Sequence, residues 1–274
     1  AEHSPTERTC AMTWTETDER QVSELDDAEN AVGIDPLLRA IGPSELIIDG
    51  SGPVDISSYP GRLIVVEGTD NAGRSTQIAL LREWLESRGF GVAHTALRRG
   101  RLAAEGLYKA KQGHTLAART MDLFYATDFA DRLNNFIIPS LRAGFVVLTV
   151  RYVYSMMARS IVRGVDPAWV RDVYRFAPRP HASFYMKIDL DHLIPRALAK
   201  RGFDYWESGM DFQEENDIYD SFIRYQSRLL KVYDQLAFEH QMDVIDANNS
   251  VRESFVALRD GVMNAVSSMQ GAQA

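Results

Sequence analysis

The pattern of apolar and polar positions becomes regular near residue 62. From there on, short apolar runs alternate with longer stretches in which apolar residues recur every three or four positions. The short runs predict buried strands, and the periodic stretches predict amphipathic helices. Strands that alternate with helices form a parallel sheet with helices on both faces. The pattern therefore predicts an α/β fold for residues 62–274.

Five apolar runs are predicted to be the strands of this sheet. The run 145–150 is apolar and rich in β-branched residues, which is typical of a strand buried on both faces. The other strands are predicted over 63–66, 91–97, 183–188 and 242–245. Helices are predicted over 75–88, over 102–142 in two pieces, over 154–163 and 167–176, from a cap at Asp191, over 219–239 and over 251–266. Ligands bind at the carboxyl ends of the strands in such sheets, so we expect the chemistry directly after these runs.

The first strand ends in a glycine-rich turn with the spacing of a phosphate loop. Four residues separate Gly68 from Gly73, and a basic and a hydroxyl residue follow. Glycines at this spacing let the backbone wrap around a polyphosphate, with N–H groups and a helix N-terminus directed at it. The donor phosphates are predicted to contact Gly68, Asn71, Ala72, Gly73, Arg74, Ser75 and Thr76, with the Ser75 hydroxyl completing a Mg²⁺ shell. The alternative, a glycine-rich turn without a ligand, is less consistent with a strand before the loop and a helix after it.

Arg74 stands where this loop pattern usually has lysine. Arginine keeps the positive charge, but it is longer and forked, so the replacement is not conservative at a tight phosphate site. The spacing still predicts that Arg74 acts on the transferring phosphate.

The net charge of the chain comes from its first 36 residues. The whole chain has 274 residues and a formal net charge of −8. Residues 1–36 contain ten acidic and two basic residues, and the remainder has 28 of each. An acidic segment with few apolar residues is typical of a flexible tail, and the Gly/Pro/Ser-containing stretch 50–61 is typical of a linker. We therefore predict an acidic, largely flexible extension and linker over residues 1–61 and one P-loop domain over residues 62–274.

The composition also excludes several classes of protein. A folded part with balanced charge lacks the basic surplus of a nucleic-acid binder, so we expect no duplex partner. The single cysteine, Cys10, excludes an intrachain disulfide. No apolar run approaches the roughly 20 residues that span a bilayer. These features predict no membrane segment and a cytoplasmic location.

Beyond the loop, the chain resembles the thymidylate kinases. The resemblance rests on a succession of segments in family order, namely Val66–Asp70 with Gly73–Gln77, Leu123–Asp128, Ile138–Gly144, Arg151 with Tyr152, Ser155, and Val244–Ala247. Of these segments, only the loop is specific to the family by itself. The remaining segments support the resemblance because they occur in the family's order. The resemblance implies a P-loop NTPase fold with a five-stranded parallel sheet, helices on both faces and a lid region.

The resemblance also implies a reaction and roles for particular residues. The family transfers a phosphoryl group from ATP to a nucleoside monophosphate with Mg²⁺. By resemblance, Asp70 would face the acceptor sugar, Phe124 would stack on the acceptor base, and Arg98 and Tyr152 would belong to the substrate site. Arg151 would bridge the donor and acceptor phosphates, because such transfer depends mainly on positioning and cations. The residues alone leave open a core position for Phe124 and a solvated position for Arg98.

Three departures from the family pattern bear on activity and specificity. Val150 precedes Arg151 where the family has aspartate, and valine cannot help to hold Mg²⁺. Phe129 replaces an arginine that lies near the base in the family. Arg159 and Ser160 replace a Tyr-Gln pair that frames thymine, so the acceptor base is not fixed by the resemblance.

The region 196–211 has the position of the family's lid. A closing lid often delivers a cation to the transferring phosphate, and Arg201 or Arg196 would supply it. A polar surface loop is the alternative. Family members are commonly dimers, and the helix from Leu116 is a candidate homodimer face.

Three functions are compatible with the sequence. The first is a kinase similar to thymidylate kinase, which phosphorylates dTMP or a related monophosphate. The second is a nucleotide-binding pseudokinase that has lost turnover through Val150. The third is a kinase of the same fold with a different small acceptor. In each case the expected partners are small-molecule nucleotides.

Overall fold

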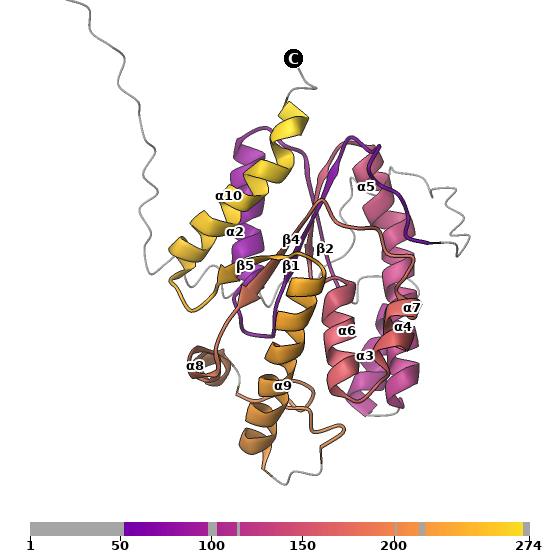
Figure 1. The fold of residues 1–274 in the computed structure, drawn as a ribbon, viewed down its shortest axis with the longest axis vertical. Helices are drawn as coiled ribbons and strands as arrows, with labels where there is room; N and C mark the ends of the chain where they lie inside the picture. Colours follow the sequence, from indigo (N-terminus) through magenta and orange to yellow (C-terminus); the bar gives the residue numbers. More distant parts are fainter. Residues whose placement is uncertain (1–51, 98–102, 114–115, 201, 214–216, 271–274) are drawn as a thin grey trace, which may run out of the picture. The chain divides into compact units, whose positions relative to one another are not determined.

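The computed structural model describes residues 52–97, 103–113, 116–200, 202–213 and 217–270 (Figure 1). Most of the predicted extension lies outside these ranges. Within the described ranges, no helix combines the length and the apolar character needed to cross a membrane.

Five parallel strands form one sheet in the described fold (Figure 1). They are β1 (Arg62–Glu67), β2 (Val92–Ala96), β3 (Val146–Val150), β4 (Ala182–Lys187) and β5 (Asp243–Asp246), in the spatial order β2-β3-β1-β4-β5. The structure thus confirms all five predicted strands. Because β1 is central, the loop after it lies between the carboxyl ends of β3 and β4, where a ligand is expected.

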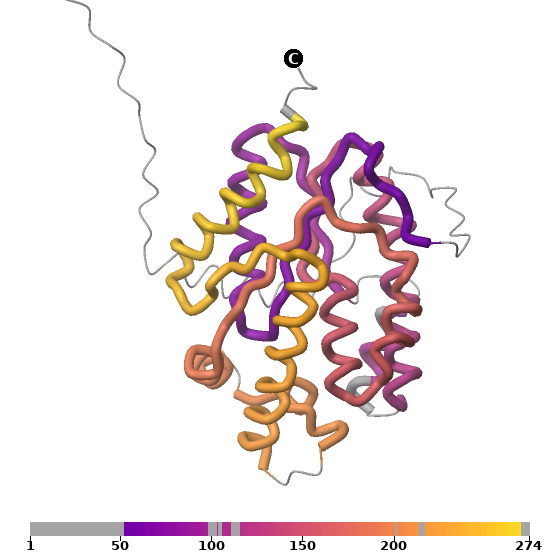
Figure 2. Tube along the Cα trace, in the orientation of Figure 1, coloured from indigo at the N-terminus to yellow at the C-terminus, as the bar shows by residue number. Residues whose placement is uncertain are grey.

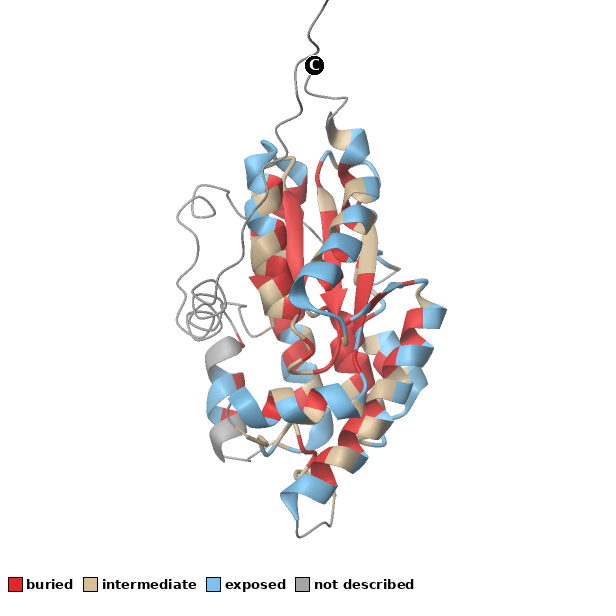
Figure 3. Cartoon of the chain, turned by 90° about the vertical axis from the view of Figure 1, so that its left-hand side faces the viewer, coloured by how far each residue is buried: buried red, intermediate tan, exposed pale blue. Residues whose placement is uncertain are grey.

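The two faces of the sheet belong to two apolar clusters. Leu63 and Val65 of β1 pack in one cluster, and Ile64 and Val66 pack in the other, with all four side chains fully buried. Figure 3 shows the strands buried between layers that are exposed on their outer sides. A strand that is apolar at consecutive positions forms because both of its faces are covered.

Helices cover both faces of the sheet, as the sequence predicts (Figures 1 and 2). The face of Ile64 and Val66 is covered by α2 (Arg74–Ser87) and α10 (Val251–Gln270). The opposite face is covered by α4 (Ala118–Arg132), α5 (Ile138–Arg142), α6 (Val153–Val162), α7 (Pro167–Val173) and α9 (Ile218–Glu239). Helix α3 (Ala104–Gly113) packs on α4, and α8 (Leu190–Lys200) follows β4. This architecture is that of a P-loop α/β fold.

The helical region after β2 differs in detail from the prediction. It divides into α3 and a second piece that starts at Ala118, as expected, but the second piece contains a π-helix, η2 (Leu133–Ile137), between α4 and α5. A π-turn bonds residue i to i+5 and so holds one residue more than an α-turn. The apolar pattern does not reveal it, because Leu133 and Ile137 are buried on the same side as their α-helical neighbours.

The structure also corrects the predicted cap of α8. Asp189, not Asp191, caps this helix, because its Oδ1 accepts a hydrogen bond from the His192 backbone N–H at 2.9 Å. A capping carboxylate bonds the N–H group two or three residues further on. Asp191 lies inside the first turn, where its charge favours the helix dipole.

His181 joins the start of β4 to β1. Its Nδ1 accepts a hydrogen bond from the Leu63 backbone N–H at 2.9 Å, and its own backbone N–H donates to the Leu63 carbonyl at 2.9 Å. Burial, and after it the nearby Arg62 guanidinium, lower the pKa of His181 from 6.5 to about 4.

Acidification should therefore destabilise the fold through His181. In the unfolded chain His181 binds a proton with a pKa of 6.5, whereas in the folded chain its pKa is about 4. The contribution of neutral His181 to the free energy of unfolding is therefore complete above pH 6.5 and is lost as the pH falls from 6.5 to about 4. His181→Asn keeps an acceptor for Leu63 and should flatten this part of a plot of melting temperature against pH. The exposed His192 changed to glutamine should keep the slope, and an unchanged slope in His181→Asn would contradict the assignment.

Candidate active site

The loop between β1 and α2 has the backbone geometry that its glycines predict. Gly68 has a φ of 145°, and a Cβ atom there would lie 2.9 Å from the Met186 carbonyl oxygen of β4. Gly73, with a φ of 88°, precedes α2 and makes no side-chain cap. An N-terminus without a side-chain cap is a favourable anion-binding end of a helix.

The remaining loop residues line this turn and the start of α2. Asn71 has a φ of 63°, a left-handed conformation that asparagine tolerates better than most residues. Ala72 is buried, and Ser75 and Thr76 lie half-buried in the first turn of α2. All seven residues predicted to bind the donor phosphates thus belong to one turn at the carboxyl end of the sheet.

Asp70 lies at the centre of a cluster of arginines. Its Oδ1 is 3.4 Å from Nη2 of Arg74 and contacts Nη2 of Arg151, and its Oδ2 is 2.5 Å from Nη2 of Arg159. The side chains of Asp70, Arg151 and Arg159 are 14%, 18% and 19% exposed. Three arginines from separate elements, the start of α2, the turn after β3 and α6, therefore share one carboxylate from the loop.

Arg74 fits into the loop although it is longer than lysine. It is only 6% exposed, and its Nη1 is buried and has no hydrogen-bond partner among the described residues. Burial lowers the pKa of Arg74, with the neighbouring Glu67 opposing this change. A buried guanidinium with an unpaired N–H group is a suitable donor to a phosphate oxygen.

Arg151 leaves β3 in a left-handed conformation. Its φ is 66°, its backbone N–H donates to the Val66 carbonyl at 3.1 Å, and its carbonyl accepts from Thr149 Oγ1 at 2.9 Å. This backbone turns the side chain toward Asp70. Burial, and after it repulsion from the Arg159 guanidinium, lower the pKa of Arg151 to about 10. Arg151 nevertheless remains cationic at neutral pH.

Glu67 ties the end of β1 to the start of α6. It is fully buried, its Oε1 accepts from the backbone N–H groups of Tyr152 at 2.7 Å and Ser155 at 3.1 Å, and its Oε2 accepts from Ser155 Oγ. The Ser155 hydroxyl also lies 2.9 Å from Tyr233 Oη of α9. Burial raises the pKa of Glu67, and these hydrogen bonds partly offset that effect. The carboxylate positions the turn that carries Arg151.

The predicted lid segment contacts the loop through Glu207, both directly and by way of Gln226 of α9. Gln226 Nε2 donates to the Glu207 carbonyl at 2.7 Å, and Gln226 Oε1 accepts from Thr69 Oγ1 at 2.5 Å. Glu207 Oε2 accepts from Asn71 Nδ2 at 3.4 Å. Segment 202–213 is also held by Arg163, which makes two hydrogen bonds to Asp211 at 2.8 and 2.9 Å. In this structure the segment therefore lies against the phosphate loop.

Val150 occupies the end of β3 as a core residue. It is 5% exposed and is aligned with Val66 of β1 and Ala96 of β2. Its side chain offers no oxygen to a metal. Within the described part of the chain, no group of three or more histidine, cysteine or acidic residues could hold a metal ion.

The aromatic residues singled out in the sequence lie in different surroundings. Phe124 is 36% exposed and lies against Gly106 of α3, where an added Cβ would be 3.2 Å from the ring. The Tyr152 ring is fully buried, and its hydroxyl donates to the Pro178 carbonyl at 2.8 Å, so this side chain is not brought to the loop. Phe129 does not border the site either. It is 1% exposed and packs edge-on against Tyr152, with ring centroids 5.0 Å apart.

Two of the predicted arginines lie outside the described residues, namely Arg98 and Arg201. Arg196, the other candidate from the lid region, belongs to α8. The contributions of Arg98 and Arg201 to the site therefore remain predictions from the sequence.

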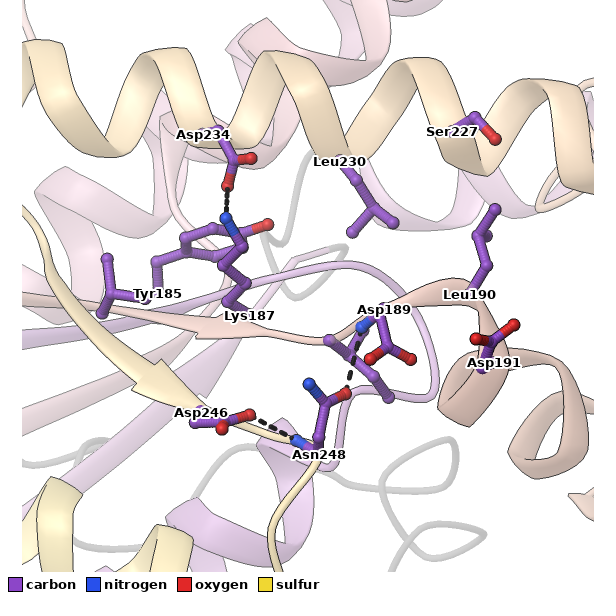
Figure 4. Close-up of a pocket in the computed structure, with 12 residues that line it drawn as sticks. Tyr185, Lys187, Asp189, Leu190, Asp191, Ser227, Leu230, Asp234, Asp246 and Asn248 are labelled. Atoms are coloured by element: carbon purple, nitrogen blue, oxygen red, sulfur yellow. Dashed lines mark hydrogen bonds and ion pairs between the residues drawn. The ribbon is translucent and has the colours of Figure 1, made fainter.

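A separate groove of about 710 Å³ lies between α9 and the strands β4 and β5 (Figure 4). Asp189 lines this groove with Asp191, Asp234 and Asp246. Lys187 pairs with Asp234 at 2.9 Å. Among the described residues that line the groove, none belongs to the loop 68–76.

Comparison with known proteins agrees with this geometry. The family model described as thymidylate kinase matches residues 66–256. "Probable thymidylate kinase 2" of Saccharolobus solfataricus is 36% identical over 201 residues, which cover 73% of this chain and 94% of the relative. The chain belongs to the thymidylate kinase family. More distant members include "Probable thymidylate kinase" of Thermococcus kodakarensis, 35% identical over 147 residues that cover 50% of this chain and 72% of the relative. "Thymidylate kinase" of Desulfotalea psychrophila is 29% identical over 160 residues, covering 58% and 77%.

The thymidylate kinase match contains the whole of the site described above. It begins at Val66, the residue before Glu67, and extends beyond Gln226. The departure at Val150 lies inside the match, whereas the acidic extension precedes it. Sequence reasoning missed the roles of Glu67, Glu207 and Gln226. For Glu67, the one available signal in the sequence was that an acidic residue ends the apolar first strand.

Proposed function

We propose that this member of the thymidylate kinase family transfers the γ-phosphoryl group of ATP to dTMP or a related nucleoside monophosphate. The observation that carries the proposal is the convergence of Arg74 and Arg151 on Asp70 beside the N-terminus of α2. A phosphate loop and two cations thus lie at one end of the sheet, and phosphoryl transfer depends mainly on such positioning and positive charge.

Each part of the cluster has a place in this reaction. The loop and the first turn of α2 would hold the donor phosphates, with Arg74 donating to the transferring group. Arg151 would stabilise the charge that spreads over the phosphoryl oxygens in the transition state. Asp70 would orient the acceptor sugar, and Phe124 and Arg98 would belong to the acceptor side, whereas the buried Tyr152 side chain would not. Arg201 would supply a further cation from the lid region.

The residues present fit a Mg²⁺ ion that arrives with ATP. Ser75 offers a hydroxyl in the first turn of α2, whereas Val150 offers no oxygen and Asp70 is engaged by arginines. Mg²⁺ commonly keeps several waters and is held largely by substrate phosphates. When bound, the ion would neutralise charge on the donor phosphates, and Ser75 would be its protein ligand.

The test is a coupled assay with Mg-ATP and a panel of deoxy- and ribonucleoside monophosphates. We expect the unmodified chain to release ADP with dTMP or a close analogue, with ATP binding measured by calorimetry in parallel. Val150→Asp, assayed beside it, shows whether the valine limits turnover. ATP binding without turnover on any monophosphate, with activity appearing only in Val150→Asp, would contradict the proposed kinase and make the chain a nucleotide-binding protein.

A further inference from the structure

Arg159 reaches Asp70 from the other side of the sheet. It lies on α6, which covers the face opposite to α2, and its Nη2 is 2.5 Å from Asp70 Oδ2. Arg74, the first residue of α2, approaches the other oxygen of the same carboxylate at 3.4 Å. The two arginines therefore hold Asp70 from different elements, and only Arg74 belongs to the phosphate loop.

Three positively charged side chains crowd around Asp70. Three guanidinium groups, those of Arg74, Arg151 and Arg159, gather there, and the carboxylates that face them are Asp70 and Glu207. Glu67 is also near, but its oxygens accept from Tyr152 and Ser155. Gathering like charges in a largely buried site is unfavourable unless an anion joins them.

Two of these arginines carry buried N–H groups without a partner. Arg159 Nε and Arg74 Nη1 are both buried, and neither has a hydrogen-bond partner among the described residues. A buried donor that lacks an acceptor is unfavourable, and the forked guanidinium matches the oxygens of a phosphate better than a single neutral acceptor. Each unpaired donor therefore points to an oxyanion, one on the α2 side of Asp70 and one on the α6 side.

We propose that Arg159 binds the phosphate group of the acceptor nucleotide. This rests on the proposed function, in which the loop with Arg74 holds the donor. Arg159 projects from a different element and a different face of the sheet, so its free donor serves the second nucleotide, while its Nη2 stays on Asp70. Arg159 is then a substrate-binding residue of this chain, and Asp70 fixes its orientation.

The test compares a nucleotide with its own nucleoside. Dissociation constants of dTMP and thymidine are measured by calorimetry for the full chain, Arg159→Met and Arg159→Lys. The preference for dTMP over thymidine should fall about tenfold to a hundredfold in Arg159→Met, as expected for loss of a charge-assisted hydrogen bond, and less in Arg159→Lys. The dissociation constant of a non-hydrolysable ATP analogue should change by less than about twofold, since its contacts lie on the α2 side.

Arg171→Met provides the matched control. Arg171 lies on α7, is 43% exposed and pairs with Glu239 at the surface, so this variant should keep the full preference for dTMP. An unchanged preference for dTMP in Arg159→Met would overturn the proposal. So would an equal loss of affinity for dTMP and thymidine, because that result places Arg159 on the sugar or base. If Arg159→Met fails to fold, as judged by its melting curve, Arg159→Lys decides by the same ratio.

The binding ratio separates this proposal from the proposed function. It requires no turnover, and it can be measured with UMP and uridine or AMP and adenosine if dTMP does not bind. A chain that phosphorylates no monophosphate but loses its preference for the phosphate in Arg159→Met would contradict the kinase and support the role of Arg159. If the chain phosphorylates dTMP and Arg159→Met keeps the full preference for dTMP over thymidine, the kinase is supported and the role of Arg159 is contradicted.

Discussion

Changing Asp70 to asparagine is expected to reduce the free energy of unfolding by about 3 kcal/mol and to lower kcat/KM at least about a hundredfold. Asp70 is the carboxylate that Arg74, Arg151 and Arg159 share, and all four side chains are largely buried. Asparagine has nearly the same shape but no charge, so three cations would lose their common partner. Urea unfolding and steady-state kinetics measure the two effects.

Asp260 offers a matched control for this substitution. It pairs with Arg259 at 2.7 Å on α10, but its side chain is 62% exposed. Exposed ion pairs contribute little to stability, so Asp260→Asn should change the free energy of unfolding by less than about 0.5 kcal/mol. Equal destabilisation by the two variants would show that the arginines around Asp70 do not depend on it.

Changing Arg151 to glutamine should lower kcat about a thousandfold and leave the KM for ATP within about threefold. The left-handed backbone of Arg151 turns its guanidinium toward Asp70, where phosphates from both nucleotides would meet. An interaction made mainly in the transition state affects turnover more than ground-state binding. The measurement is steady-state kinetics at saturating dTMP with varied ATP.

Arg151→Lys tests whether charge alone suffices. Lysine keeps one positive charge but lacks the fork that can contact two oxygens, so most of the loss in kcat should remain. A fall of less than about tenfold in Arg151→Gln would remove Arg151 from the transition state. In that case the cations of α2 and of the lid would have to carry the reaction.

The strands and the phosphate loop could be predicted because their signals are local. Strand β1 is a run of apolar residues before Glu67, and the spacing of Gly68 and Gly73 defines the loop within a few residues. The family resemblance then supplied a role for Arg151. Neither step requires knowing which distant segments meet.

The contacts that organise the site could not be predicted, because they join distant parts of the chain. Arg159 and Asp70 are 89 residues apart, and Ser155 and Glu67 are 88 residues apart. Both pairs depend on how β1 and α6 meet, which periodicity does not specify. From the sequence, Arg159 is only an unusual residue at a family position, and its contact with Asp70 comes from the structure.

Phe129 illustrates a different limit. Helical spacing places it and Phe124 on the same helix, but which of the two enters the core depends on the rotation of that helix about its axis. In the structure Phe129 packs with Tyr152, Tyr174 and Phe176, while Phe124 stays partly exposed. By resemblance Phe129 stands at a position near the acceptor base, whereas in the structure its side chain lies in the core.

The π-helix η2 also affects how this chain should be aligned with its relatives. Its extra residue lies between α4 and α5, and each residue added to a helix rotates the segment before it by about 100° relative to the segment after it. In a relative whose helix is α-helical throughout, the residues equivalent in space to those of α4 are displaced by one position in the alignment. From such a relative, acceptor contacts can be transferred by position after Ile138, but before Leu133 a one-residue gap has to be placed within η2 first.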